Sequence, residues 1–385
     1  MRAKIIIKKI LYEIIKIICI SIRLFPIKKN KIIFWNTDFK KYGCNPKYLT
    51  EYLLQQQEKY EIIWVFSHKN NINIPSNVKK INFYSLRYLY ELHTSKIIIT
   101  NSRIRKDFYF FKRKSQIYIQ TWHSSLRLKK IEKDAESTLN KDYIKDAKID
   151  SKKCDYLISA SKKSTEIFRN AFWYNGEILE TGTPRGDFLI NNSEAIKSKI
   201  KKSMKISEEK RILLYAPTFR NNEKKDTYSF DFDKIIQTLQ KKYKKEWVIF
   251  YRLHPNIIKK DCIIHKSVYD VSSYNDMQEL IISSDILVTD YSSTMFDAAL
   301  IKKPCFLLVR DLEEYLKNER KFYFNITELP FEIAKSSKEL EEKFEQFNFK
   351  EYKEKCLKFL ENIKMYEDGN ANFRIYQLIK KIVKE

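Results

Sequence analysis

Several short β-branched runs in this sequence end at polar side chains that suit phosphate binding and proton transfer. The run at residues 116–120 is followed closely by His123, Ser124 and Ser125. An imidazole next to two hydroxyls, with basic residues after them, suits a general base beside an anion-binding site. A lone histidine is also often structural, and these residues by themselves leave that alternative open.

A second run, residues 211–217, ends at Pro217 and is followed by Thr218 and Arg220. A hydroxyl and a guanidinium at the end of a strand can both bind a phosphate. The alternative is a turn in which the threonine only caps backbone groups. We keep these residues as candidates for substrate binding.

In the third run, residues 247–255, Arg252 and His254 are two positions apart and therefore point to the same face of a strand. Pro255 ends the strand, which places both groups at its carboxyl end. A guanidinium beside an imidazole suits a pyrophosphate. We expect Arg252 to bind it and His254 to take part in catalysis by stabilising charge on the leaving phosphate.

The run at residues 286–290 leads into a helical pattern that begins near Ser292 and Ser293. Hydroxyls and unpaired backbone N–H groups at such a position favour an anion, although serines there often act only as caps. Asp297 lies one helical turn after Ser293 and is a candidate acceptor for the hydroxyls of a sugar or polyol. The alternative is an acid that stabilises the helix dipole.

A further candidate, Arg185, lies in the segment 181–187, which we interpret as a turn that presents this side chain. No metal is expected. The six cysteines and five histidines have no ligand spacing. Asp231 and Asp233 resemble a metal-binding pair but begin a helical pattern, where acids are common. No cofactor is expected either, since the scarce glycines form no nucleotide-binding loop.

The elements that must position these residues alternate between strand and helix, which predicts an α/β fold with parallel sheets. Two series with a break near residue 200 predict two doubly wound, Rossmann-like domains that bind ligands at strand carboxyl ends. Strands are expected at 31–35, 61–66, 79–83, 96–100, 116–120 and 155–159, then at 211–217, 247–255, 268–271, 286–290 and 305–309. Helices are expected at 46–59, 85–95, 161–173, 193–210, 231–246, 275–285, 292–303 and throughout 337–385.

The first 26 residues predict a helix that lies on a membrane rather than across it. Residues 4–25 are very apolar, but Lys8, Lys9, Glu13, Lys16 and Arg23 fall on one half of a helical wheel. A membrane span needs about 20 residues with few charges, whereas this pattern fits an amphipathic helix at an anionic interface. An ordinary helix packed on the protein is the alternative. The formal net charge of +25 also requires an anionic partner.

Six motifs, in order, resemble the CDP-glycerol glycerophosphotransferase family, the teichoic acid primases and polymerases with a GT-B fold. They are CNPKYLTEYL (44–53), TWHSS (121–125) with LKK (128–130), TGTPRGDFL (181–189), YAPTFR (215–220), RLHP (252–255) and TDYSSTMFD (289–297). The resemblance implies that His123 is the base at the acceptor hydroxyl. It also implies that a CDP-alcohol site is lined by Arg185, Pro217, Thr218, Arg252, His254, Ser292, Ser293 and Asp297.

One departure from the family pattern concerns the loop after His123. The family usually has Gly-Thr-Pro where this chain has Ser124-Ser125-Leu126, and a side chain in place of glycine narrows the loop. The absence of a long segment before the motifs leads us to expect an enzyme of primase or capsule type at least as much as a long-chain polymerase.

The function implied is transfer of glycerol phosphate, or a related alcohol phosphate, from CDP-glycerol to a lipid-linked or polymeric acceptor, with release of CMP, at the cytoplasmic face of the membrane. A GT-B glycosyltransferase that uses a nucleotide sugar is one alternative. A non-catalytic nucleic-acid-binding protein is another, but no signature of one is present, so no nucleic acid partner is expected. The expected parts are the membrane helix (1–26), an acceptor domain (27–200), a CDP-alcohol domain (201–365) and a C-terminal helix that packs back on the first domain (366–385).

Overall fold

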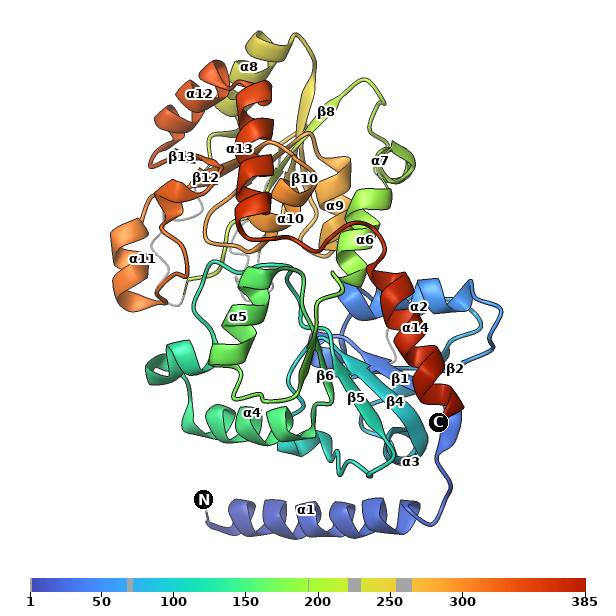
Figure 1. The fold of residues 1–385 in the computed structure, drawn as a ribbon. Helices are drawn as coiled ribbons and strands as arrows, with labels where there is room; N and C mark the ends of the chain where they lie inside the picture. Colours follow the sequence, from blue (N-terminus) through green and yellow to red (C-terminus); the bar gives the residue numbers. More distant parts are fainter. Residues whose placement is uncertain (1, 68–71, 193, 221–229, 254–264) are drawn as a thin grey trace.

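The computed structural model describes residues 2–67, 72–192, 194–220, 230–253 and 265–385, so His254 lies outside the described residues. Within these ranges the chain forms two parallel β-sheets, each covered by helices, and Figure 1 shows the second domain above the first. The two doubly wound α/β domains predicted from the alternation of strands and helices are therefore confirmed.

The first sheet has seven strands in the order β3-β2-β1-β4-β5-β6-β7. Ile32 of β1 lies opposite Ile62 of β2 and Ile97 of β4. All six residues of β4 are buried, as expected of a parallel sheet with both faces covered. The elements are β1 (Lys28–Trp35), α2 (Cys44–Leu54), β2 (Glu61–Phe66), β3 (Lys79–Asn82), α3 (Leu86–Thr94), β4 (Ser95–Thr100), β5 (Ile117–Gln120), α4 (Lys141–Lys153), β6 (Tyr156–Ile158), α5 (Lys162–Ala171) and β7 (Glu177–Leu179).

The second sheet has six strands in the order β10-β9-β8-β11-β12-β13, which repeats the winding of the first. Its elements are α7 (Glu194–Ser203), β8 (Arg211–Tyr215), α8 (Phe232–Tyr243), β9 (Trp247–Tyr251), β10 (Val268–Asp270), α9 (Met277–Ser283), β11 (Ile286–Thr289), α10 (Thr294–Leu300), β12 (Cys305–Leu308), α11 (Leu312–Asn318), β13 (Glu332–Ala334), α12 (Ser337–Gln346) and α13 (Phe349–Asn362).

The chain crosses between the domains twice. It first passes from the first domain to the second through α6 (Pro184–Asn191). This crossing comes before the expected boundary near residue 200, since Ile200 of α7 already packs in the core of the second sheet. It returns through α14 (Ala371–Lys384), whose Ile375, Ile379 and Ile382 pack in the first-domain core beside Ile32. Figure 1 shows this last helix lying along the first sheet.

The N-terminal helix α1 (Arg2–Ile22) lies against the first domain on one side only. Its Cys19 and Ile22 are buried, and the Tyr12 ring lies 5.7 Å from that of Tyr109. The other side presents an apolar stripe to solvent, with exposed fractions between 48% and 64% at Ile7, Ile10, Leu11, Ile14, Ile17 and Ile20. In the described part of the chain, no helix has the length and apolar character needed to span a membrane.

The structure differs from the expected elements at several places. The segment 181–187 is not only a turn: α6 begins at Pro184, and the Thr183 side chain accepts a hydrogen bond from the Gly186 N–H. The tail is broken into α12, α13 and α14 instead of being helical throughout. The edge strands β7 and β13 had not been expected, since three-residue strands give almost no periodic signal. The helices α4 and α11 had not been expected either.

Candidate active site

The predicted site residues follow the carboxyl ends of strands in both sheets. His123 comes after β5, Thr218 after β8, Arg252 after β9 and Ser292 after β11. Carboxyl ends of parallel strands share one edge of a sheet, where ligands of such folds bind. Side-chain contacts between the first and second domains, described below, bring these two edges together.

His123 is held with one ring nitrogen bound and the other directed away from that bond. Its Nδ1 lies 2.9 Å from the carbonyl oxygen of Asn101. A carbonyl can only accept, so Nδ1 carries the proton and a neutral ring keeps a lone pair on Nε2. The ring also stacks on Trp122, with centroids 4.4 Å apart. The imidazole is therefore oriented as a proton acceptor.

The pKa of His123 is lowered to about 4, chiefly by desolvation, with Arg127 and Arg185 adding to the effect and the Asn101 carbonyl opposing it. The side chain is nevertheless exposed to solvent. The ring is thus neutral near pH 7.

Arg185 connects His123 to the second domain. Its Nη1 donates to the His123 carbonyl oxygen at 2.5 Å, and its Nη2 pairs with the Asp297 carboxylate of α10. Asp297 is 1% exposed and also accepts from the Ser125 hydroxyl at 3.3 Å and from the Gln278 amide at 3.3 Å. Four sequence-predicted residues therefore meet at the domain interface, but the Asp297 carboxylate is occupied by protein groups. Its predicted contact with a polyol stays a prediction.

Thr218 and Arg220 are brought together by a carboxylate that the sequence analysis had not singled out. Asp290 accepts from the Thr218 hydroxyl at 2.7 Å and from Arg220 Nη2 at 2.9 Å. The Nε of Arg220 also donates to Asp311 at 2.7 Å. Because this guanidinium is 5% exposed and binds two acids, its observed role is to join the strand-end loops. Pro217 is buried beside it, and direct phosphate contacts of all three residues stay predictions.

The remaining predicted donor-site residues are more accessible. The Nη1 of Arg252 donates to the carbonyls of Val271 and Tyr274 at 3.0 and 2.8 Å, which fixes the guanidinium, and burial lowers its pKa. Ser292 and Ser293 are half-buried. Ser293 makes no capping hydrogen bond with its side chain, although it stands at the N-cap of α10.

Cations from the basic stretch after His123 add a positive field at this interface. Arg127 is 4% exposed, and its guanidinium lies 4.2 Å from the centre of the Phe168 ring. The Nζ of Lys129 lies 5.2 Å from the Tyr315 ring centre, and burial lowers its pKa to about 8. These charges suit an anionic substrate. Ser124 is buried in the same loop, and its carbonyl accepts from Arg127 at 3.4 Å.

Asn45 is a site residue whose role the sequence did not reveal, although its motif was recognised. Its amide nitrogen donates to the carbonyls of Thr121 and Trp122, both at 3.0 Å, and its oxygen accepts from the Arg185 N–H at 3.0 Å. It therefore joins the loop of His123 to the start of α6. Its partners are distant in the sequence, so no local pattern could have indicated them.

Metal ligands were not found in the described part of the chain, where no group of three or more His, Cys, Asp or Glu side chains is arranged around a common point. The Asp231 side chain accepts from the Lys234 N–H as the N-cap of α8. This confirms the interpretation of Asp231 as a helix-start acid.

Comparison with known proteins places this site in a family. The sequence profile of CDP-glycerol:poly(glycerophosphate) glycerophosphotransferase matches residues 17–381. The chain is 32% identical to a teichoic acid poly(glycerol phosphate) polymerase of Bacillus spizizenii, over 98% of this chain and 99% of that one. It is 33% identical to the protein of the same name from Staphylococcus epidermidis, over 93% of this chain but only 52% of that one, so it spans about half of that relative's length.

Among solved structures, that of the wall teichoic acid polymerase TagF is similar, with a TM-score of 0.82, 32% identity and coverage of 93% of this chain and 90% of that one. The similarity extends over both domains, which confirms the predicted GT-B-like fold. With its profile match over nearly the whole length, the chain belongs to the CDP-glycerol:poly(glycerophosphate) glycerophosphotransferase family.

Proposed function

We propose that this protein transfers glycerol phosphate, or a related alcohol phosphate, from CDP-glycerol to a hydroxyl of a lipid-linked or polymeric acceptor in the synthesis of teichoic acid or a similar cell-surface polymer. The observation that carries the proposal is the state of His123. This neutral imidazole, with its proton held on Nδ1 by the Asn101 carbonyl, lies at the meeting point of two nucleotide-binding-type domains in a chain of this family.

In the proposed reaction, His123 Nε2 takes the proton of the acceptor hydroxyl. The acceptor oxygen then forms a bond to the phosphorus that carries the glycerol, the bond from that phosphorus to the CMP oxygen breaks, and CMP leaves with the electron pair. Phosphoryl transfer depends chiefly on positioning and charge stabilisation. No metal is required by the residues that this proposal uses.

The low pKa of His123 is compatible with this role. Arg127 and Arg185 contribute to that low value, and the two phosphates of a bound donor would offset their charge. An anion near the ring favours its protonated form. The imidazole is therefore expected to become a stronger base when the donor is bound, which is when a base is needed.

The donor is proposed to lie against the second domain, near Arg252, which follows β9, and near Ser292 and Ser293, which follow β11. The predicted role of His254 in stabilising the leaving phosphate stays a prediction. The acceptor then approaches from the first domain, where His123 lies. The donor and the acceptor are assigned to different domains because the carboxyl-end edges of the two sheets lie near each other, joined by the contacts of Arg185 with the His123 carbonyl and with Asp297.

Membrane attachment is proposed to occur through the exposed apolar stripe of α1. The stripe lies on the side of the helix opposite Cys19 and Ile22, which pack against the protein. A helix of this kind can bury its apolar side at the acyl boundary while lysines contact anionic headgroups. Peripheral binding to the cytoplasmic face would bring the site to a lipid-linked acceptor.

The test measures nucleotide release, CMP from CDP-glycerol or CDP-ribitol and UDP from UDP-sugars, with the wild type and His123→Ala. His265→Ala, a histidine change in the segment just before β10 and outside the proposed site, is the matched control. We expect CMP from a CDP-alcohol only, loss of turnover by about 10²-fold or more in His123→Ala, and little change in the control. Transfer from a UDP-sugar, or normal turnover of His123→Ala, would refute the proposal.

A further inference from the structure

Gln120, the last residue of β5, crosslinks the two loops that hold His123 in place. Its side chain is 1% exposed. The Oε1 atom accepts from the Trp122 N–H at 3.0 Å, and Nε2 donates to the Ser102 carbonyl and to the Tyr118 hydroxyl, both at 2.8 Å. Both amide hydrogens and the amide oxygen are therefore used inside the protein.

This crosslink runs parallel to the hydrogen bond that fixes the tautomer of His123. Trp122 precedes His123 by one residue, and Ser102 follows Asn101 by one residue. The bond from His123 Nδ1 to the Asn101 carbonyl, 2.9 Å long, thus spans the same two loops as the Gln120 carboxamide. A shift of one loop relative to the other would change both contacts together.

The loop before His123 needs such support because its backbone is in an unfavourable conformation. Trp122 has a φ of 51°, in the left-handed region that residues with a Cβ rarely adopt. The N–H that Gln120 binds belongs to this same residue. The Trp122 ring then stacks under His123 and meets Phe172 edge-on, with centroids 4.7 Å apart, so the backbone turn also sets the position of the ring.

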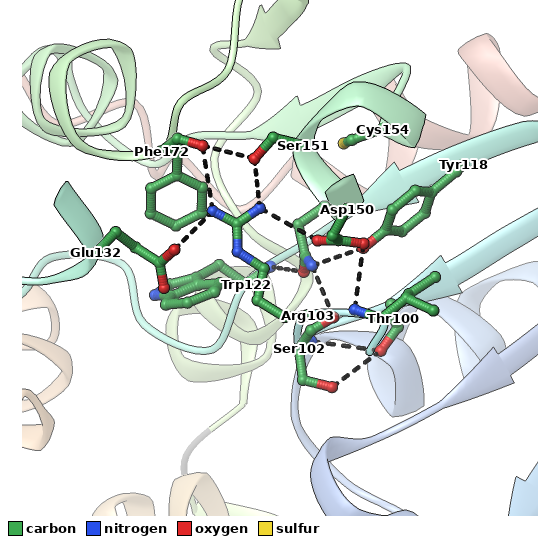
Figure 2. A network of polar contacts seen from close by, with 12 residues as sticks. Thr100, Ser102, Arg103, Tyr118, Trp122, Glu132, Asp150, Ser151, Cys154 and Phe172 are labelled. Carbon is green, nitrogen blue, oxygen red and sulfur yellow. Dashed lines mark hydrogen bonds and ion pairs between the residues drawn. The ribbon is translucent and has the colours of Figure 1, made fainter. Parts of the chain in front are cut away.

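The other end of the crosslink is anchored by a buried ionic network, shown in Figure 2. Arg103, the residue after Ser102, binds Glu132 at 2.9 Å and Asp150 at 3.1 Å, and its guanidinium lies 4.3 Å from the centre of the Phe172 ring. The Ser102 carbonyl is therefore attached to a rigid part of the first domain. Gln120 transmits that rigidity to the loop of His123.

We infer that Gln120 is a positioning residue that sets the tautomer and orientation of His123. The inference rests on the proposed role of His123 as the base, but the structural part of it can be measured without any turnover. Gln120 touches no reacting atom and acts through the Trp122 N–H and the Ser102 carbonyl.

The test compares Gln120→Met with Gln116→Met. Gln116 lies just before the same strand, is fully buried, donates through Nε2 to the Leu92 and Ser95 carbonyls at 2.8 Å, and accepts from the Arg113 N–H at 3.0 Å. It therefore makes the same number of side-chain hydrogen bonds, two donated and one accepted, at the opposite end of β5, remote from His123. The two changes should lower the melting temperature by similar amounts.

The decisive readout is the ¹⁵N NMR spectrum of histidine-labelled full-length protein, in which only five imidazoles occur and the His123 signal is assigned by its loss in His123→Ala. In the wild type and Gln116→Met we expect His123 protonated on Nδ1. In Gln120→Met we expect a mixture of tautomers, a shifted pH titration of this ring, and a fall in kcat for CMP release from CDP-glycerol of about tenfold or more.

The outcomes separate the two proposals. An unchanged His123 tautomer and titration in Gln120→Met overturns the positioning role, whatever the activity. A changed tautomer with unchanged kcat supports the positioning role and refutes His123 as the base. Should Gln120→Met fail to fold, hydrogen exchange of the wild-type Trp122 amide decides: protection like that of β4 supports the crosslink, and fast exchange overturns it.

Discussion

Replacing Arg103 by Met should destabilise the first domain strongly, because it would leave two buried carboxylates without a cation. Asp150 is fully buried and Glu132 is 3% exposed. Arg103 binds both of them and also donates to the Ser151 hydroxyl at 2.8 Å. Methionine retains much of the apolar contact with Phe172 but none of the charge. The cause of the loss would therefore be electrostatic rather than steric.

The expected size follows from this burial. Removing one partner of a buried ion pair costs about 3–5 kcal/mol, since the other charge stays desolvated. Burial already raises the pKa of Asp150 in the presence of Arg103. Without the arginine this pKa should rise further, so that the carboxyl becomes neutral in the folded variant. The loss of stability should therefore shrink as the pH falls from 7 towards 4, because a neutral carboxyl is less costly to bury.

The assay is urea unfolding followed by tryptophan fluorescence, which reports mainly on the first domain because four of the five tryptophans, Trp35, Trp64, Trp122 and Trp173, lie there. Arg105→Met is the matched control. Arg105 pairs with Asp107 at 3.0 Å, but both side chains are more than half exposed, so its loss should cost less than about 1 kcal/mol. A loss below about 1 kcal/mol for Arg103→Met, or one that grows as the pH falls, would refute this reasoning.

Three further predictions concern pH, the membrane and the donor. His93 is fully buried, with its Nδ1 bound to the Leu89 carbonyl and its Nε2 accepting from the Phe111 N–H, and burial lowers its pKa to about 4. Between about pH 6.5 and 4 the unfolded chain then binds more protons than the folded chain. The free energy of unfolding should therefore fall by up to about 3 kcal/mol as the pH drops through this window. A His93→Gln variant whose free energy of unfolding depends on pH as steeply as that of the wild type, in urea titrations, would contradict this. Changing Ile10, Ile14 and Ile17 of α1 to Gln should abolish co-sedimentation with anionic vesicles at an unchanged melting temperature. The control Leu357→Gln, at an apolar side chain of α13 that is 47% exposed, should leave co-sedimentation intact. Equal sedimentation of both variants would place the anchor elsewhere. The double change Ser292→Ala and Ser293→Ala should weaken CDP-glycerol binding in calorimetry by about tenfold with little change in melting temperature, and a loss confined to stability would reduce these serines to helix caps.

Much of the architecture was already determined by local features of the sequence. After one charged residue each, the runs 61–66 and 96–100 consist of β-branched and aromatic residues. They are long enough to predict buried parallel strands, and the structure has strands there. The order of motifs along the chain also indicated the family, which the comparisons confirm. These features depend on periodicity and on residue order, which do not require knowledge of any distant contact.

Tertiary structure alone decided which polar groups face each other. No sequence pattern around Arg220 indicated that it would bind Asp290 and Asp311. Likewise, no pattern around Asp297 indicated that Arg185 would bind its carboxylate. The same holds for the tautomer of His123, which depends on a carbonyl 22 residues away in the chain. The sequence could indicate which residue types lie at strand ends. A side chain's partner, however, depends on how distant segments pack, within one domain for Arg220 and His123 and between the domains for Arg185. Burial makes an unpaired polar group costly and so selects the pairing.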